Sequence, residues 1–350
     1  MTDASAQAPD NLLGDMVREI FRDHSLKAPL HAAADGGGFD EPLWATITES
    51  GFETVLGGAE PGTLADAVSI LRHAGYFAAR VPLAEAMLAH WLAARCGWEE
   101  SSAVPLVALT PLEAPALGFT GAPTCVLPDV PFGRHATAIY ASSGRQMARC
   151  TTQASGVREA ANLAGEPRDT LTLQREHFQR ADATIEFDEL LSHAALFRAA
   201  LMAGAMERTL DLAIDHAASR SQFGKPIAAF QAVQQALAQL AGHVAAGTAA
   251  VDRAAGHFTP LTAAIAKSRT SEAAGKAAEI AHQVIAAMGY TLEHPLHLVT
   301  RRLWSWRDEC GNETFWNARI GASAIAAGGE SLWQMLTGSA VDGSGLRASL

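Results

Sequence analysis

Two short segments of the sequence bring together residue types that suit a nucleotide ligand. The first, RSQFGKPIAAFQ at residues 220–231, contains Arg220, Gln222, Phe223, Gly224 and Gln231. A guanidinium offers forked, charged donors to a diphosphate, a glycine lets a ligand approach the backbone, and an aromatic ring packs against a flat heterocycle. Glutamine amides donate and accept, as sugar hydroxyls and base nitrogens require. The segment therefore predicts a nucleotide-binding corner between two helices.

The second segment, QVIAAMGYTLEHP at residues 283–295, supplies Gln283 and Ala287 at the end of a long helical stretch. Structural alternatives exist for several of these positions. Arg220 is also a favourable charge at the C-terminal end of a helix. Gln283 could be a buried amide whose hydrogen bonds are satisfied within the protein, and Gly289 could be a helix cap. The residues by themselves leave both interpretations open.

Composition narrows the classes of function. The chain of 350 residues is 49% hydrophobic and 18% charged, which is typical of a globular protein with a large core. Its net charge of −11 argues against nucleic acid as a partner. The four cysteines are dispersed without metal-ligand spacing, and no apolar run reaches the length of a bilayer span. The first residues, MTDASAQAPDN, lack the apolar core of a secretory signal. We expect a cytoplasmic protein without a metal site or a membrane segment.

Hydrophobic spacing predicts the elements that must position the two segments. Residues 1–102 show helical periodicity, with Thr63 as the cap of a helix that we expect to stop at Gly75. Residues 103–186 form a shortened β-rich region, with strand-like runs at 104–109, 124–127, 137–140 and 170–173. Residues 187–350 predict four long antiparallel helices, among them 189–219, 261–287 and 313–336. The predicted fold is mainly α: an N-terminal helical domain, a small middle β domain and a C-terminal four-helix bundle.

The C-terminal part of the chain resembles the acyl-CoA dehydrogenase family. Residues 220–231 are similar to its R-x-Q-F-G-x-P-I-x-x-F-Q segment, and residues 283–295 to its Q-x-x-G-G-x-G-Y-x-x-E-x-P segment. Arg301, Arg302 and the CGNE stretch at 310–313 follow where the family has its R-D and E-G-T segments. Three segments in the same order and spacing carry the resemblance, and the architecture of the first two domains agrees with it.

The resemblance implies an FAD-dependent protein that takes part in the α,β-desaturation of an acyl-CoA thioester. It also implies that electrons leave to an acceptor similar to electron-transfer flavoprotein. In this family the FAD lies at a subunit interface, so the two segments would contact a cofactor bound mainly by a neighbouring subunit. The chain would then be an obligate homo- or hetero-oligomer, a dimer or a tetramer.

The family's reaction also requires a carboxylate base that removes the α-proton while a hydride leaves the β-carbon. An ungapped match from residues 283–295 puts Cys310 at the position of that base. Matching the N-E pair at 312–313 to a similar pair in the family puts Glu309 there instead, which makes Glu309 the candidate catalytic residue. At the family's other base position the sequence offers only Ala194, Ala195 or Phe197.

Several departures from the family pattern point to a specialised subunit. The glycine pair of the second segment is Ala286 and Ala287 here, and the β-rich region lacks the family's T-E-P and W-x-T-S segments. In this respect the chain resembles the short subunit of heteromeric members, including those that handle sterol side chains. Two hypotheses follow: a catalytic subunit, or a non-catalytic partner that completes the FAD site and stabilises a catalytic subunit. A flavin oxidase or monooxygenase on the same fold is a third.

Overall fold

The computed structural model describes residues 10–27, 38–58, 61–100, 102–109, 123–143, 146–151 and 154–328. Helices come first along the chain: α1 (Asp10–Lys27), α3 (Glu41–Glu49), α4 (Leu64–Tyr76) and α5 (Leu83–Cys96). Thr63 caps α4 as predicted, in a reciprocal capping box with Asp66. The predicted stop at Gly75 is wrong, because α4 continues to Tyr76 and Gly75 serves a helix contact instead.

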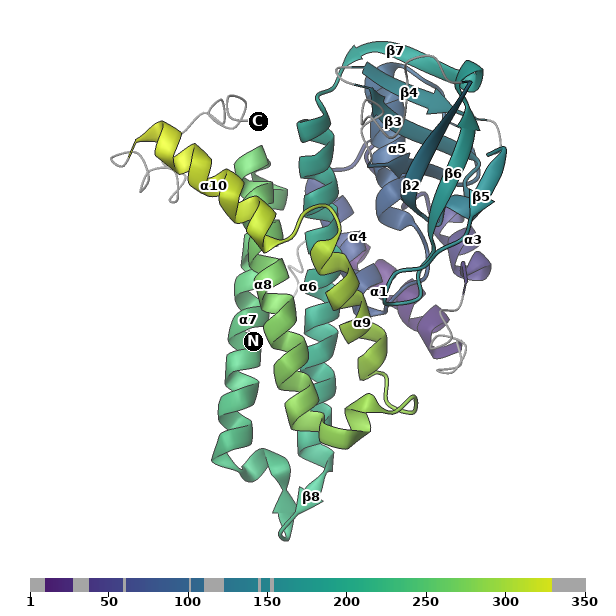
Figure 1. Cartoon of the computed structure of the whole chain (residues 1–350). Coiled ribbons are helices and arrows are strands. Elements are labelled where there is room, and N and C mark those ends of the chain that lie inside the picture. Colours follow the sequence, from purple (N-terminus) through teal and green to yellow (C-terminus); the bar gives the residue numbers. More distant parts are fainter. Residues whose placement is uncertain are drawn as a thin grey trace, which may run out of the picture.

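A small β region follows, and it consists of two sheets (Figure 1). The four-stranded sheet has the order β1 (Pro105–Ala108), β3 (Ala138–Ser143), β4 (Gln146–Cys150) and β7 (Phe178–Thr184), with β1 and β3 parallel. The three-stranded antiparallel sheet has the order β2 (Thr124–Pro131), β6 (Arg168–Gln174) and β5 (Gly156–Arg158). All four predicted strand-like runs coincide with strands, namely β1, β2, β3 and β6.

The C-terminal part is a helical bundle, as predicted. Its long helices are α6 (Phe187–Ser219), α7 (Gln231–Gly256) and α8 (Pro260–Ile285), which run antiparallel in Figure 1, and α10 (Glu313–Ala327) completes it. The sequence prediction missed a further helix, α9 (Leu296–Asp308), which packs on α6 and α8. Its buried residues recur at helical spacing through Leu296, Val299, Leu303 and Trp306. The part of the predicted last helix beyond residue 328 lies outside the described residues.

The N-terminal helices and the bundle meet at a backbone contact between α4 and α6. A Cβ atom on Gly75 would lie 1.9 Å from the carbonyl oxygen of Leu201, and one on Gly204 would lie 1.7 Å from that of Arg72. Only glycine tolerates such an approach at both positions. The two helices therefore leave no space between them at this crossing.

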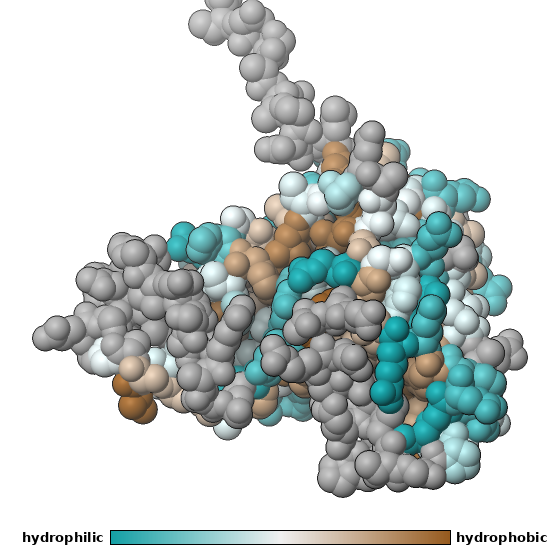
Figure 2. Space-filling model, turned by 90° about the horizontal axis from the view of Figure 1, so that it is seen from above, coloured by the Kyte–Doolittle hydropathy of each residue, from teal (hydrophilic) through white to brown (hydrophobic). Residues whose placement is uncertain are grey.

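The outer surface is mixed in character. Seen from above, hydrophobic residues gather in a band that is bordered by hydrophilic ones (Figure 2). Among the described helices, none combines the length and the hydropathy that crossing a bilayer requires.

Candidate functional site

The first predicted segment forms a hairpin at one end of the bundle. Strands β8 (Ser221–Gln222) and β9 (Lys225–Pro226) pair across the two residues Phe223 and Gly224, which have φ angles of 51° and 81°. Positive φ at both central positions is the geometry of a tight two-residue hairpin turn. Phe223 adopts it without the freedom of glycine, and its side chain is 91% exposed. The hairpin therefore presents an aromatic ring to its surroundings at some cost in backbone energy.

The second segment ends α8 at the same end of the bundle, where Figure 1 draws β8 and the C-terminal ends of α6 and α8 together. A ring contact between His216, near the end of α6, and His294, 6.2 Å apart between centroids, links the two segments. Beyond α8, the short helix η5 (Ala286–Tyr290) begins with Ala286 at φ 57° and ψ −141°. Glycine adopts that conformation readily and alanine only at a cost in backbone energy, so Ala286 is strained.

All seven residues predicted to contact a cofactor lie on the surface of this chain. Arg220, Gln222, Phe223, Gly224, Gln231, Gln283 and Ala287 are each exposed. The buried-amide alternative for Gln283 is therefore wrong. No acidic side chain among the described residues pairs with Arg220, which leaves its guanidinium open to an anion. All seven side chains or backbone positions therefore face the surroundings of this chain.

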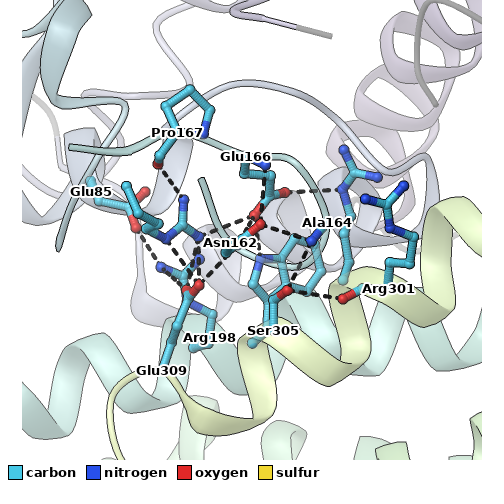
Figure 3. Close-up of polar contacts among 12 residues, drawn as sticks. Glu85, Asn162, Ala164, Glu166, Pro167, Arg198, Arg301, Ser305 and Glu309 are labelled. Carbon is cyan, nitrogen blue, oxygen red and sulfur yellow. Dashed lines mark hydrogen bonds and ion pairs between the residues drawn. The ribbon is translucent and has the colours of Figure 1, made fainter. Parts of the chain in front are cut away.

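Glu309 lies elsewhere, where the β region, α6 and α9 meet (Figure 3). Arg168 donates to both of its carboxylate oxygens, from Nη2 at 2.7 and 2.9 Å and from Nε at 2.9 Å. Arg198 of α6 approaches the Oε2 atom at 3.1 Å, and the Asn162 amide donates to Oε1 at 3.1 Å. Both oxygens are thus engaged by charged or amide donors, so neither is open to accept a proton from a substrate.

The contacts of Glu309 belong to a larger ion-pair network. Arg198 also donates to Glu85 of α5 at 2.6 Å, and Arg168 also donates to Glu166 at 3.1 Å. Arg302 of α9 donates to the other oxygen of Glu166 at 3.0 Å. Burial by itself would raise the pKa of the Glu166 carboxyl, but the Arg302 and Arg168 guanidiniums outweigh it and hold that pKa at about 2. Three carboxylates and three guanidiniums therefore neutralise each other inside the protein. We call these six residues the Glu309 cluster.

A small cavity lies beside four members of the Glu309 cluster, although Glu309 itself does not line it. The cavity lined by Glu85, Glu166, Arg168 and Arg198 together with apolar residues of α4, α5 and α9 measures about 20 Å³. A volume of that size holds about one water molecule. The close crossing of α4 and α6 adjoins it through Leu201 and Ala74. A cofactor ring or an acyl chain does not fit there.

A lysine of helix α8 stabilises the chain next to the turn that follows Glu309. Cys310 and Gly311 have positive φ angles of 58° and 86°. Lys267, fully buried in α8, donates to the carbonyl oxygen of Arg307 at 2.8 Å and to the Ser271 hydroxyl at 3.0 Å. Burial lowers the pKa of the Lys267 amine to about 8. The thiol of Cys310, the other candidate for the base position, has its pKa raised by burial, so it is a poor source of thiolate.

Sequence reasoning named Glu309 and Arg302 without relating them to each other, and it missed the other four members of the Glu309 cluster. A signal was present for Arg198, a single charged residue in an apolar helical stretch, since a buried arginine needs an acidic partner. At the other base position, Ala194, Ala195 and Phe197 are all buried in α6 next to Arg198. No local signal marked Glu85, Glu166 or Arg168.

Comparison with known proteins identifies the family. The model of the acyl-CoA dehydrogenase C-terminal domain matches residues 187–307. The acyl-CoA dehydrogenase IpdE2 of Mycobacterium tuberculosis is 31% identical over 83% of this chain and 89% of its own length. The chain belongs to the acyl-CoA dehydrogenase family. The matched region contains both surface segments and ends before Glu309.

Solved structures of the family share the fold over nearly the whole chain. The Tcur3481–Tcur3483 steroid acyl-CoA dehydrogenase variant superimposes with a TM-score of 0.78 at 21% identity, covering 92% of this chain and 98% of that one. The ChsE4–ChsE5 complex of Mycobacterium tuberculosis gives a TM-score of 0.73 at 21% identity, covering 93% and 99%. The resemblance drawn from the sequence motifs is therefore confirmed.

Proposed function

We propose that this chain is the non-catalytic subunit of an FAD-dependent acyl-CoA dehydrogenase that desaturates an acyl-CoA thioester. In this proposal a partner subunit carries the acyl-CoA and most of the FAD, and this chain completes the FAD site from outside. The observation that carries the proposal is the ion pairing of Glu309. At the position where the candidate base was expected, Arg168 and Arg198 engage both carboxylate oxygens at distances between 2.7 and 3.1 Å.

The surface segments suit the role of completing a site on another molecule. Arg220 would bind the diphosphate, Phe223 would pack against a ring, and Gln222, Gln231 and Gln283 would hydrogen-bond sugar or adenine groups. Gly224 and Ala287 would allow the backbone to come close. FAD, when bound, supplies the acceptor for the hydride that leaves the β-carbon. The exposed, unpaired guanidinium of Arg220 supports this fit, because it lacks an anion within the described part of the chain.

The second candidate is the catalytic subunit itself, with Glu309 as base. Membership of the family favours it, since desaturation of acyl-CoA with FAD is the reaction that the resemblance implies. The contacts of Glu309 count against it, because a base must have an oxygen free to face the substrate. In either case we propose an electron-transfer flavoprotein-like acceptor and a homo- or hetero-oligomeric assembly. The solved ChsE4–ChsE5 complex is a heteromeric precedent within the fold.

One experiment separates the two candidates. The chain is purified alone and after co-expression with a candidate acyl-CoA dehydrogenase partner subunit. Each preparation is examined for flavin absorbance and for bleaching of the flavin by acyl-CoAs without oxygen. We expect a colourless chain alone and a yellow, reducible complex. Arg220→Ala should lower the flavin content of the complex, whereas Arg253→Ala, an exposed arginine of α7, should leave it unchanged. A yellow chain that acyl-CoA bleaches without any partner would refute the non-catalytic role.

A further inference from the structure

A separate cleft of about 600 Å³ lies between α3, the loop after α5 and the short helix η2 (Gly133–His135). It shares no lining residue with the cavity of the Glu309 cluster. The side chains that give it chemical character are Phe39, Glu41, Glu53, His90, Glu100 and His135. It also contains no residue of the two surface segments.

The cleft is negatively charged. Glu41, Glu53 and Glu100 line it, and no lysine or arginine is among its described lining residues. Its two histidines do not compensate, because burial lowers the pKa of both His90 and His135 and so favours their neutral forms near pH 7.

Glu53 is the least satisfied acid of the cleft. It follows α3 in a turn and is 7% exposed, and its Oε2 atom is buried without a hydrogen-bond partner among the described residues. Burial raises the pKa of its carboxyl to about 7. Burying a carboxylate without a cation or a donor is costly, so a cationic group that reached this oxygen would gain a strong interaction.

Aromatic rings stand beside these acids. Phe39 stacks on the His135 imidazole with 4.9 Å between centroids, and it meets Trp44 of α3 at 5.8 Å. Rings next to carboxylates favour a flat or alkylated organic cation, which gains from the ring faces and from the charge together. We propose that this cleft binds a small organic cation with an amidinium or guanidinium head. Glu53 is its counterion, and the ring of Phe39 packs against it.

The test uses benzamidine as the cation and benzamide as its uncharged counterpart, each titrated calorimetrically into the full chain. We expect benzamidine to bind at one site, at least about tenfold more tightly than benzamide. Glu53→Gln should weaken benzamidine binding by at least about tenfold, while Glu176→Gln, an exposed acid in the β region, should not change it. Equal binding of the two compounds, or no saturable binding of benzamidine, would overturn the proposal without recourse to any variant.

The same cationic head could belong to a free compound or to a side chain of a partner subunit. Repeating the benzamidine titration on the co-expressed complex distinguishes these sources. Retained binding identifies a site for a free compound, and binding that is lost on assembly is the result expected if an arginine guanidinium of the partner subunit occupies the cleft. Flavin absorbance reports separately on the proposed function, so failure of one proposal leaves the other measurable.

Discussion

Replacing Glu309 by glutamine tests the interpretation of the Glu309 cluster most directly. The substitution keeps the shape of the side chain but removes the anion that Arg168 and Arg198 share. Both guanidiniums are almost completely buried, and each keeps one other carboxylate, Glu166 for Arg168 and Glu85 for Arg198. The cluster then holds one positive charge in excess, in surroundings that water hardly reaches.

The size of the effect follows from these contacts. Removing one partner of a buried ion pair costs about 3–5 kcal/mol. The Glu309 side chain is 21% exposed, so water already screens part of its charge, and the two remaining carboxylates absorb part of the loss. We therefore expect Glu309→Gln to lower the free energy of unfolding by about 2–3 kcal/mol.

Urea unfolding followed by circular dichroism measures this change. The matched control is Glu279→Gln, an exposed acid that pairs with Lys276 at 2.9 Å, for which we expect less than about 1 kcal/mol. A Glu309→Gln chain as stable as the wild type would refute the ion-pair reasoning.

The same variant in the co-expressed complex gives the catalytic readout. If the partner supplies the base, Glu309→Gln changes the rate of flavin reduction by acyl-CoA only slightly. Loss of a general base would slow the reduction by about 10²–10⁴-fold. A folded complex that contains flavin and shows such a loss would establish Glu309 as the base.

Three further predictions concern the backbone and pH. Ala286→Gly should raise the free energy of unfolding by about 1 kcal/mol, because glycine adopts a φ of 57° without strain. The control Ala245→Gly, on the exposed face of α7, should lower it by about as much, and thermal melts of both variants measure the two changes. Gly204→Ala should destabilise the chain by at least about 1–3 kcal/mol, because the added Cβ atom would clash with the backbone of α4. The control Gly242→Ala should stabilise the chain, because no atom lies within 4 Å of the added Cβ. Equal melting points of the two variants would contradict the close crossing of α4 and α6. Burial raises the pKa of Glu53 from 4.5 to about 7 in the folded chain. The stability that the protonated carboxyl contributes is therefore fully present below pH 4.5 and is lost as the pH rises through 7. Urea unfolding midpoints across this range should fall with rising pH in the wild type and fall less in Glu53→Gln.

The sequence by itself determined the order of the elements and the two surface segments. Helical and strand-like spacing is local, so the helices, the β region and the bundle could be read from short windows. The same holds for the corner between two helices at 220–231, because its residues and the flanking helices are neighbours in the chain; that the corner is a hairpin was shown by the structure. Helix α9 was not predicted although its buried residues recur at helical spacing, because Arg301, Arg302 and Arg307 interrupt the apolar pattern.

Only the tertiary structure decided what surrounds Glu309. Its partners come from the β region and from α6, far away in sequence, and no local pattern relates Arg168 or Arg198 to it. Alignment could place a carboxylate near the base position, but it could not tell whether that oxygen would face a substrate or a guanidinium. Ion pairing at this depth depends on which side chains the packed helices bring within about 3 Å of each other, and that is a property of the folded chain.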